Sequence, residues 1–396
     1  KTMARIIVTG YMIRHPVAGN MLAYFHYILG FLRLGHEVYY LEESGWPGAC
    51  YNPLQGSYGD DASYGIRAVQ VLMARYNADV PLCYVNRDSG HTVGIAAREL
   101  EHLLSSADLL LNLGGVCSLP EFDLSPRRVL IDMDPLFTQL GRFANEDLES
   151  YDVYLSYGAN IGQPGCTVPC AGLVWAPTAP PVVPDLWQGF SNVERRDLTD
   201  APYTTICNWS AYGFVDYKGE RYGQMDEEFA RLLELPSHVS QPLELALAGA
   251  NVETRQRFRA AGWSIRDAAE VSNDVSSYRS YIAASRGELS AAKNAYVKTR
   301  SGWFSDRSVC YLAAGRPLVV QDTGISDWMT TGHGVLTFST MNQAIDCIEQ
   351  LESNYAGHCA SAREIAEDVF SYKVVLPRIL ERGFADTRDP ARDDET

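Results

Sequence analysis

The first 45 residues combine two hydrophobic periodicities that predict a β-α-β unit. Residues 6–9 are a short apolar, β-branched run that ends at Gly10, and residues 37–42 form a second strand-like run. Between them, apolar residues recur at helical spacing over residues 21–34, and Gly35 follows where glycine commonly ends a helix. A strand, a helix and a strand within this length predict a right-handed parallel crossover.

The strand pattern recurs along the rest of the first half of the chain. Continuous apolar runs cover residues 107–113, 128–132 and 153–157, and each ends in glycine or in an acidic turn. Such runs are typical of a parallel sheet that is buried on both faces. Ligands of these sheets bind beyond the carboxyl ends of the strands, so the residues that follow the strands are the first candidates for a site.

A second series of strands begins after a stretch with four prolines at residues 175–184, which we expect to be an extended linker. The apolar runs of this series are residues 203–209, 243–249 and 317–321, and helical spacing covers residues 309–314, 342–352 and 360–370. The pattern predicts the α/β class, with two doubly wound Rossmann-like domains that face a cleft. We place them at residues 1–188 and 189–384, and we expect the polar tail, residues 385–396, to be disordered.

Composition narrows the choice of partners. The chain has 33 Lys and Arg against 49 Asp and Glu, a net charge of −16, and no basic cluster, so nucleic acid is not expected as a partner. No apolar run reaches the roughly 18–20 residues that cross a bilayer, and we expect a cytoplasmic protein without a signal peptide. The nine cysteines are scattered, and the closest two, Cys166 and Cys170, lack a second pair that would complete a metal site. We therefore expect reduced core cysteines and no bound metal.

Several common catalytic motifs are absent from the sequence. The first strand-helix loop has only Gly10 and Gly19, nine residues apart, instead of the dinucleotide fingerprint G-x-G-x-x-G. The P-loop, the G-x-S-x-G elbow and the H-E-x-x-H helix are missing as well. Dehydrogenases, P-loop ATPases, α/β-hydrolases and zinc proteases are therefore disfavoured.

Three candidate residues follow predicted strands of the first half. His15 could accept a proton from a hydroxyl near neutral pH, or it could only cap its loop. Asp134 follows residues 128–132, although Asp-Pro is also ordinary turn chemistry. Asn20 is a candidate for acceptor binding, and a helix N-cap is the structural alternative. We take His15 and Asp134 as the candidate catalytic residues.

The second half has its richest polar stretch between residues 285 and 308. Gly302 and Ser305 belong to a small, polar turn before a predicted helix, and such a turn offers free backbone N–H groups to a diphosphate. Lys293 and Arg307 could add positive charge against a leaving phosphate, or they could form surface salt bridges with neighbouring acids.

Two further features of this half could contact a nucleotide sugar. Trp303 could stack on a base, although tryptophan is more often partly buried packing. Asp322, Thr323 and Gly324 follow the run at residues 317–321 directly, and they could hold sugar hydroxyls. The competing interpretation of Asp322 is an N-cap for the next helix.

The order of these segments resembles the donor-binding half of GT-B glycosyltransferases. The turn at residues 302–305 and the run at residues 310–324, which contains Ala-Gly-Arg-Pro-Leu-Val-Val, succeed each other as in that superfamily. Residues 332–338 resemble its following strand, and residues 362–370 resemble its C-terminal helices. Leu-Gly-His-Glu-Val at residues 34–38 is similar to the start of its acceptor domain.

The chain departs from this family in one respect. Retaining members have two glutamates, where this sequence has Gly302 and Cys310. The resemblance therefore points to a divergent subgroup, near CgeB-like or bacterial natural-product enzymes, in which Glu288 or Asp306 takes over donor contacts.

The resemblance implies transfer of a sugar from a nucleoside-diphosphate sugar, with UDP or TDP as the nucleotide, to a small-molecule or glycan acceptor. The donor site would consist of Glu288, Lys293, Gly302, Trp303, Ser305, Asp306, Arg307, Asp322, Thr323 and Gly324. The leaving diphosphate would be stabilised without a metal or another cofactor, and His15 or Asp134 would accept the proton of the acceptor if the reaction inverts. A sugar-nucleotide epimerase on the same fold and a non-catalytic nucleotide- or carbohydrate-binding protein are the alternatives.

Overall fold

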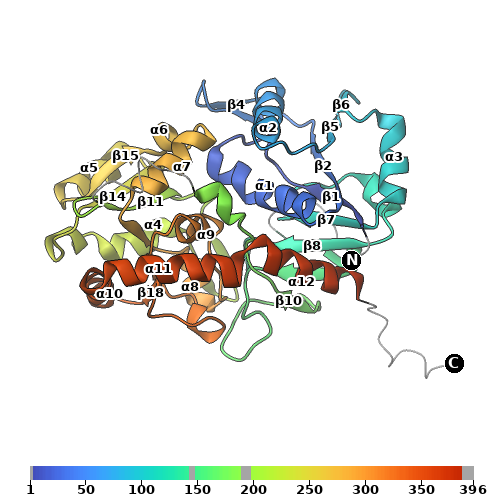
Figure 1. The fold of residues 1–396 in the computed structure, drawn as a ribbon. Coiled ribbons are helices and arrows are strands. Elements are labelled where there is room, and N and C mark those ends of the chain that lie inside the picture. Colours follow the sequence, from blue (N-terminus) through green and yellow to red (C-terminus); the bar gives the residue numbers. More distant parts are fainter. Residues whose placement is uncertain (1–2, 142–147, 189–197, 386–396) are drawn as a thin grey trace.

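Two parallel sheets organise the computed structural model, which describes residues 3–141, 148–188 and 198–385 (Figure 1). The first sheet has the order β10-β9-β8-β7-β1-β2-β5-β6, and among its pairs only β5–β6 is antiparallel in the described chain. Its strands are β1 (Arg5–Thr9), β2 (Glu37–Ser44), β5 (Leu82–Asn86), β6 (Thr92–Gly94), β7 (Leu109–Leu113), β8 (Arg128–Asp132), β9 (Val153–Ser156) and β10 (Trp175–Pro177). Its helices are α1 (Ala18–Arg33), α2 (Ser63–Arg75) and α3 (Ala97–Ser106).

The second sheet has the order β15-β14-β11-β16-β17-β18, with all pairs parallel. Its strands are β11 (Tyr203–Asn208), β14 (Leu243–Ala248), β15 (Ser264–Asp267), β16 (Gly287–Ser290), β17 (Leu318–Gln321) and β18 (Val335–Phe338). The helices of this half are α4 (Met225–Phe229), α5 (Val252–Ala260), α6 (Ala268–Ser272), α7 (Val275–Ala284), α8 (Asn294–Thr299), α9 (Asp306–Ala313), α10 (Met341–Ser353) and α11 (Tyr355–Ile365). The last helix, α12 (Tyr372–Phe384), returns to the first half, where Gly383 lies against Leu109 and Val129. Two hairpins, β3 (Cys50–Asn52) with β4 (Ser57–Gly59) and β12 (Val215–Tyr217) with β13 (Glu220–Tyr222), lie outside the two large sheets.

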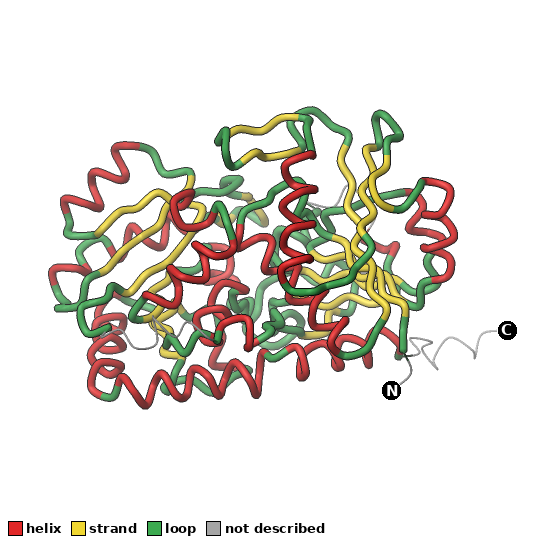
Figure 2. The backbone as a smooth tube through the Cα atoms, turned by 45° about the horizontal axis from the view of Figure 1, so that its top comes forward, coloured by secondary structure: helices red, strands yellow, loops and turns green. Residues whose placement is uncertain are grey.

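Both sheets have the doubly wound order that the hydrophobic pattern predicts. In each, the chain starts in the middle, moves to one edge and then returns to build the other side, so the order reverses between β1 and β7 and between β11 and β16. Alternate residues of β1 serve the two faces, because Ile6 and Val8 join the core under α1 whereas Ile7 joins the core under α3. Figure 2 shows the two sheets as separate groups of strands with helices around and between them.

The proline-rich segment corrects one expectation. Trp175–Pro177 is not a free linker but the edge strand β10, which pairs with β9. Proline is tolerated there because an edge strand leaves one side of its backbone without a partner. Val182 and Val183, farther along the segment, are buried. The boundary predicted near residue 188 adjoins residues 189–197, which lie outside the described residues. Of the predicted tail, residues 385–396, all but the first residue lie outside them as well, so these two expectations stay predictions.

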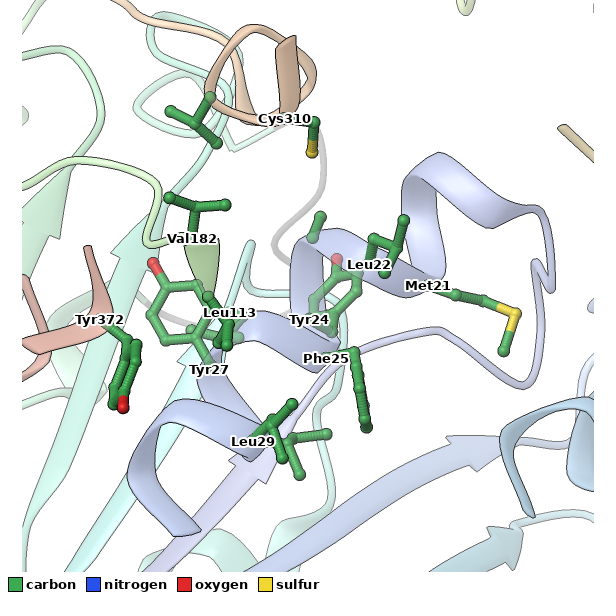
Figure 3. Packing of buried hydrophobic residues seen from close by; sticks show 14 of the residues in the cluster. Met21, Leu22, Tyr24, Phe25, Tyr27, Leu29, Leu113, Val182, Cys310 and Tyr372 are labelled. Carbon is green, nitrogen blue, oxygen red and sulfur yellow. The ribbon is translucent and has the colours of Figure 1, made fainter. Parts of the chain in front are cut away.

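Helix α1 lies between the two halves and is buried on nearly every side (Figure 3). It packs on its own sheet and also against α7, α9 and α12, which follow later in the chain. Gly30 permits the approach of α12, since a Cβ there would lie 2.5 Å from a methyl group of Leu376. A helix that is apolar all round needs such surroundings, so α1 fixes the position of one half relative to the other. None of the described helices is long and apolar enough to cross a bilayer.

His26 is a titratable group inside this packing. It is 1% exposed, and its Nδ1 accepts a hydrogen bond from the Val183 N–H at 3.1 Å. Burial lowers the pKa of His26 to about 3. An unfolded histidine takes up a proton near pH 6.5, so the unfolded state binds more protons than the folded state as the pH falls. The contribution of His26 to stability is therefore complete above pH 6.5 and is lost toward pH 3.

We predict that, as the pH falls from 7 to 5, protonation of His26 in the unfolded state lowers the free energy of unfolding by about 2 kcal/mol. The variant His26→Gln keeps an acceptor for Val183 but cannot be protonated, so its stability should fall less over the same interval. Urea unfolding at both pH values measures the difference. An identical fall in the variant and the parent protein would contradict the neutral, buried state of His26.

Candidate functional site

The carboxyl ends of the two sheets meet in the middle of the molecule. Asp134 follows β8 and Lys293 follows β16, and the Lys293 Nζ lies 3.0 Å from both carboxylate oxygens of Asp134. Nearby, the Trp303 Nε1 donates a hydrogen bond to the Met133 carbonyl at 3.1 Å. Ligands of doubly wound sheets bind at strand ends, so this junction is the candidate functional site.

Two tyrosines complete a polar cluster around the Asp134–Lys293 pair. The hydroxyls of Tyr212 and Tyr296 both donate to the Asp134 carboxylate, and the Lys293 Nζ lies 2.5 Å from the Tyr212 hydroxyl. Asp134 is predicted to act on the acceptor and Lys293 on the donor. The structure brings the two side chains into contact, and both roles stay predictions. The tyrosines escaped notice because tyrosine is common throughout the chain and carries no positional signal.

Asp132 holds the turn that presents Asp134. Its buried carboxylate accepts hydrogen bonds from the Asp134 N–H at 2.8 Å and the Thr138 hydroxyl at 2.6 Å. Gln139 and Ser156 donate to its other oxygen, at 2.8 and 2.6 Å. Burial raises the pKa of Asp132, and these hydrogen bonds act in the opposite direction. The four donors make the turn a rigid part of the site.

Glu42 holds the loop between β1 and α1 in place. This fully buried carboxylate, on β2, accepts the N–H groups of Ile13 and Arg14 at 2.7 Å each and the hydroxyl of Tyr40 at 2.5 Å. The Arg14 guanidinium lies 3.4 Å away. No sequence signal pointed to this role, because β2 also contains Glu37 and Glu43.

His15 lies in this loop among aromatic rings. Its ring is 5.1 Å from Tyr51 and 6.2 Å from Tyr58, centroid to centroid, and it stacks on Tyr58. Burial lowers the pKa of His15 to about 4, so its ring is neutral at physiological pH. Asn20 donates to the carbonyls of Tyr11 and His15 at 3.0 and 2.8 Å. Asn20 therefore braces the loop, and the N-cap position of α1 belongs to another residue, Val17.

Tyr11 connects the two parts of the site on the side of the first half. Its ring lies 6.1 Å from that of His15. Burial raises the pKa of Tyr11 to about 12, and the charges of Asp134 and Asp306 contribute to the rise. Both carboxylates are thus near enough to Tyr11 to interact with it electrostatically. Like Tyr212 and Tyr296, Tyr11 is a site residue that was not predicted from the sequence.

On the side of the second half, Arg307 and Glu288 form a buried ion pair. The Arg307 Nε lies 2.6 Å from Glu288, while its other nitrogens donate to the Ser290 hydroxyl at 2.7 Å and the Ile206 carbonyl at 2.9 Å. Glu288 is fully buried. Within the described chain, its Oε2 has no hydrogen-bond partner. Arg307 thus ties α9 to β11 and β16, and the donor contacts predicted for both residues stay predictions.

The start of α9 has its own polar groups. Ser305 is the N-cap, and its hydroxyl accepts the N–H of Arg307 at 3.2 Å. The carboxylate of Asp306 accepts the same N–H at 3.0 Å, and burial raises the pKa of Asp306. The Arg307 N–H is therefore already used by two side chains of its own turn.

Residues from the first half cover the predicted glycine turn. The Asn160 side chain donates to the carbonyls of Arg300 and Gly324, at 3.2 and 3.0 Å, and a Cβ at Gly302 would lie 2.8 Å from it. Gly302 has a φ of +75°, a backbone conformation that favours glycine. The lack of a side chain at Gly302 and Gly324 thus leaves room for Asn160 and lets the two halves approach, independently of any ligand.

Asp322 and Thr323 make local bonds next to this turn. Asp322 accepts the N–H groups of Gly324 and Ile325, at 2.9 and 3.0 Å, whereas the N-cap of the following helical turn is Gly324. The Thr323 hydroxyl donates to the Trp303 carbonyl at 2.7 Å. The cavity that Thr323 shares with Trp303 and Arg307 has a volume of about 20 Å³, which is room for about one water molecule. Among the residues that the structure describes, no group of three or more His, Cys, Asp and Glu side chains could hold a metal ion.

We predict that Arg307→Ala destabilises the protein by about 3–5 kcal/mol, because it leaves the Glu288 carboxylate buried without its partner. The double variant Arg307→Met with Glu288→Leu removes both charges and keeps most of the side-chain volume, so it should be more stable than Arg307→Ala. Urea unfolding measures both. A double variant that is less stable than Arg307→Ala would show that the charges are not a coupled pair.

No family model matches the chain, and no curated protein matches it in sequence. Solved structures match it over nearly their whole lengths. An α-glucosyltransferase in complex with UDP has a TM-score of 0.59 at 10% identity, over 96% of this chain and 100% of that one. HepE from Anabaena, with UDP and glucose, has a TM-score of 0.55 at 14% identity, with coverages of 96% and 98%. AviGT4, a glycosyltransferase involved in avilamycin A biosynthesis, has a TM-score of 0.53 at 12% identity, with coverages of 96% and 97%.

Identities of this size carry the fold alone, so they do not transfer a substrate. The match extends over both sheets, and the resemblance to a CgeB-like subgroup stays a prediction. The two doubly wound halves of this chain form the GT-B fold, as the order of its sequence segments predicted.

Proposed function

We propose that the chain is a glycosyltransferase that moves a sugar from a UDP- or TDP-sugar to a small-molecule or glycan acceptor. The observation that carries the proposal is the junction of the two sets of strand ends. Lys293 and the start of α9 lie on its second-half side, and Asp134 follows β8 on the other. Solved structures of the same fold hold UDP or UDP-glucose.

Lys293 is the cation best placed to meet a departing diphosphate. Negative charge grows on the diphosphate as the bond to the sugar breaks, and a preorganised donor commonly contributes roughly 3–4 kcal/mol to such a transition state. The Lys293 side chain is 18% exposed and would exchange Asp134 for a phosphate oxygen. Arg307, held by Glu288, would act by fixing the start of α9.

His15 is the preferred base if the reaction inverts the anomeric carbon. Its neutral ring has one nitrogen that can accept a proton. The pKa of about 4 makes it a weaker base than the near-neutral histidine expected from the sequence. Asp134 is less available for this role, because Lys293 neutralises it and two tyrosine hydroxyls occupy it.

The acceptor we propose is not a nucleic acid. One solved structure of this fold holds a 13-mer DNA together with UDP. The net charge of −16 on this chain would repel a phosphate backbone.

We predict that UDP or TDP raises the thermal stability of the protein in the presence of EDTA, because protein groups rather than a metal would hold the diphosphate. A ligand at about 100 times its dissociation constant stabilises the folded state by ~2.7 kcal/mol. Differential scanning fluorimetry with UDP, TDP, GDP, ADP and CDP measures the shift. No shift with any of the five would contradict the proposal. Conversion of the donor without an acceptor would favour an epimerase, and binding without turnover would favour a binding protein.

A second prediction separates the two partners in the central ion pair. Lys293→Met should weaken the binding of UDP about tenfold, because it removes a charge-assisted hydrogen bond. Asp134→Asn should not weaken it, since this change releases the Lys293 cation. The matched control is Lys298→Met, which changes a more exposed lysine on α8 that pairs with Glu220. Equal effects of Lys293→Met and Lys298→Met on the dissociation constant, measured by calorimetry, would remove Lys293 from the donor site.

A further inference from the structure

A cavity of about 390 Å³ lies between the two halves next to the β1–α1 loop. Helix α2 forms one wall, and residues 273–275, at the start of α7, form another. Pro16, the neighbour of His15, belongs to the lining. Its volume falls within the range of roughly 300–1,000 Å³ that is usual for small-molecule sites. The cavity is therefore large enough for an acceptor, and its lining includes the chain neighbour of the proposed base.

The lining combines apolar surface with positive charge. The apolar part consists of Pro16, Met21, Ala68, Val71, Leu72 and Val275. Arg67 and Arg75 lie two helical turns apart on α2, with the exposed Val71 between them. Tyr64 adds an aromatic ring one turn before Arg67. A ligand that fits would carry an apolar or aromatic body and an anionic group.

Arg67 is the cation that is available to a ligand. It is exposed, and it makes no hydrogen bond or ion pair with any residue that the structure describes. Its attraction to the carboxylate of Asp61 acts over a longer range, and both oxygens of Asp61 already accept hydrogen bonds from Ser63. Arg75 is engaged, since its guanidinium donates to the Ser276 hydroxyl of the other half at 2.5 Å.

Asp274, the acidic residue in the lining, does not neutralise Arg67. Its two oxygens accept the N–H and the hydroxyl of Ser277 as the N-cap of α7. It remains near Arg75, which favours its ionised form. Arg67, at the other end of the α2 wall, is left without an acidic partner at hydrogen-bond distance.

We propose that this cavity binds the acceptor and selects one with a carboxylate or phosphate group, which Arg67 holds; the assignment to an acceptor rests on the proposed function. The acceptor body lies along the apolar wall of α2, and its reacting hydroxyl faces His15 past Pro16. The protein as a whole repels anions, so an unpaired arginine in a cavity supplies local selectivity that the net charge does not.

Three simple probes test the selectivity: benzoate, phenyl phosphate and neutral benzamide, each titrated by ligand-observed NMR. We expect at least one of the two anions to bind about tenfold more tightly than benzamide, and Arg67→Gln to remove that advantage. The two anions distinguish carboxylate from phosphate recognition. Arg98→Gln, an exposed arginine on α3 that has no hydrogen bond or ion pair with the described residues, is the matched control and should change nothing. Equal binding of benzamide and both anions, or equal effects of the two arginine variants, would overturn the proposal.

A second variant tests the place of binding. Val71 is 67% exposed in the cavity wall, so Val71→Trp should fill the cavity without disturbing the core. It should abolish binding of the preferred anion and leave the thermal shift with UDP unchanged. Retained anion binding in Val71→Trp would place the anion elsewhere and refute the cavity assignment. If UDP gives no shift in the parent protein while the anion still requires Arg67, the glycosyltransferase proposal fails and the anion site stands.

Discussion

The burial of helix α1 on nearly all sides is the constraint on which the rest of the structure depends. A helix of this kind must be covered by more than its own sheet, and here the second half supplies surface through α7 and α9, while α12 returns to pack on the first half. The Tyr27 hydroxyl, on α1, meets the Tyr157 hydroxyl at 2.8 Å inside this packing. Since α1 begins directly after the loop of His15, and α9 begins at Asp306, the same packing sets the distance between the two sides of the site.

The site is held in place by buried carboxylates on the strands. Glu42 on β2 holds the backbone of the His15 loop, Asp132 on β8 holds the turn of Asp134, and Glu288 on β16 holds the first turn of α9 through Arg307. A buried acid is unfavourable unless several donors satisfy it, and the site loops supply many of those donors. Each acid therefore ties a segment of the site to a strand, and the rigid sheet thereby fixes the position of that segment.

Much of the fold could be predicted because long apolar strands and glycine stops are local signals. Arg128–Asp132 has the predicted bounds, whereas Ser264–Asp267 and Gly287–Ser290 were not predicted, because both are short and half polar. The strand-end rule found Asp134, whereas Lys293 became a candidate through the polar stretch that contains it. Neither signal could show that the two touch, or that Arg307 meets Glu288, since such pairs depend on how distant segments pack. Trp175–Pro177 was misjudged because an edge strand tolerates the prolines that indicate a linker elsewhere.

The glycine turn shows how one sequence signal can serve two physical demands. A turn with Gly302 before a helix suits a phosphate, but the same lack of a side chain admits Asn160 from the first half. The remaining space there, about 20 Å³, is too small for a nucleotide, whereas the cavity beside α2 has room for a small molecule. A donor that used this turn would have to displace Asn160 and separate the strand ends. Binding of the donor would then be coupled to the contact between the halves, because Lys293 exchanges Asp134 for phosphate at the same junction.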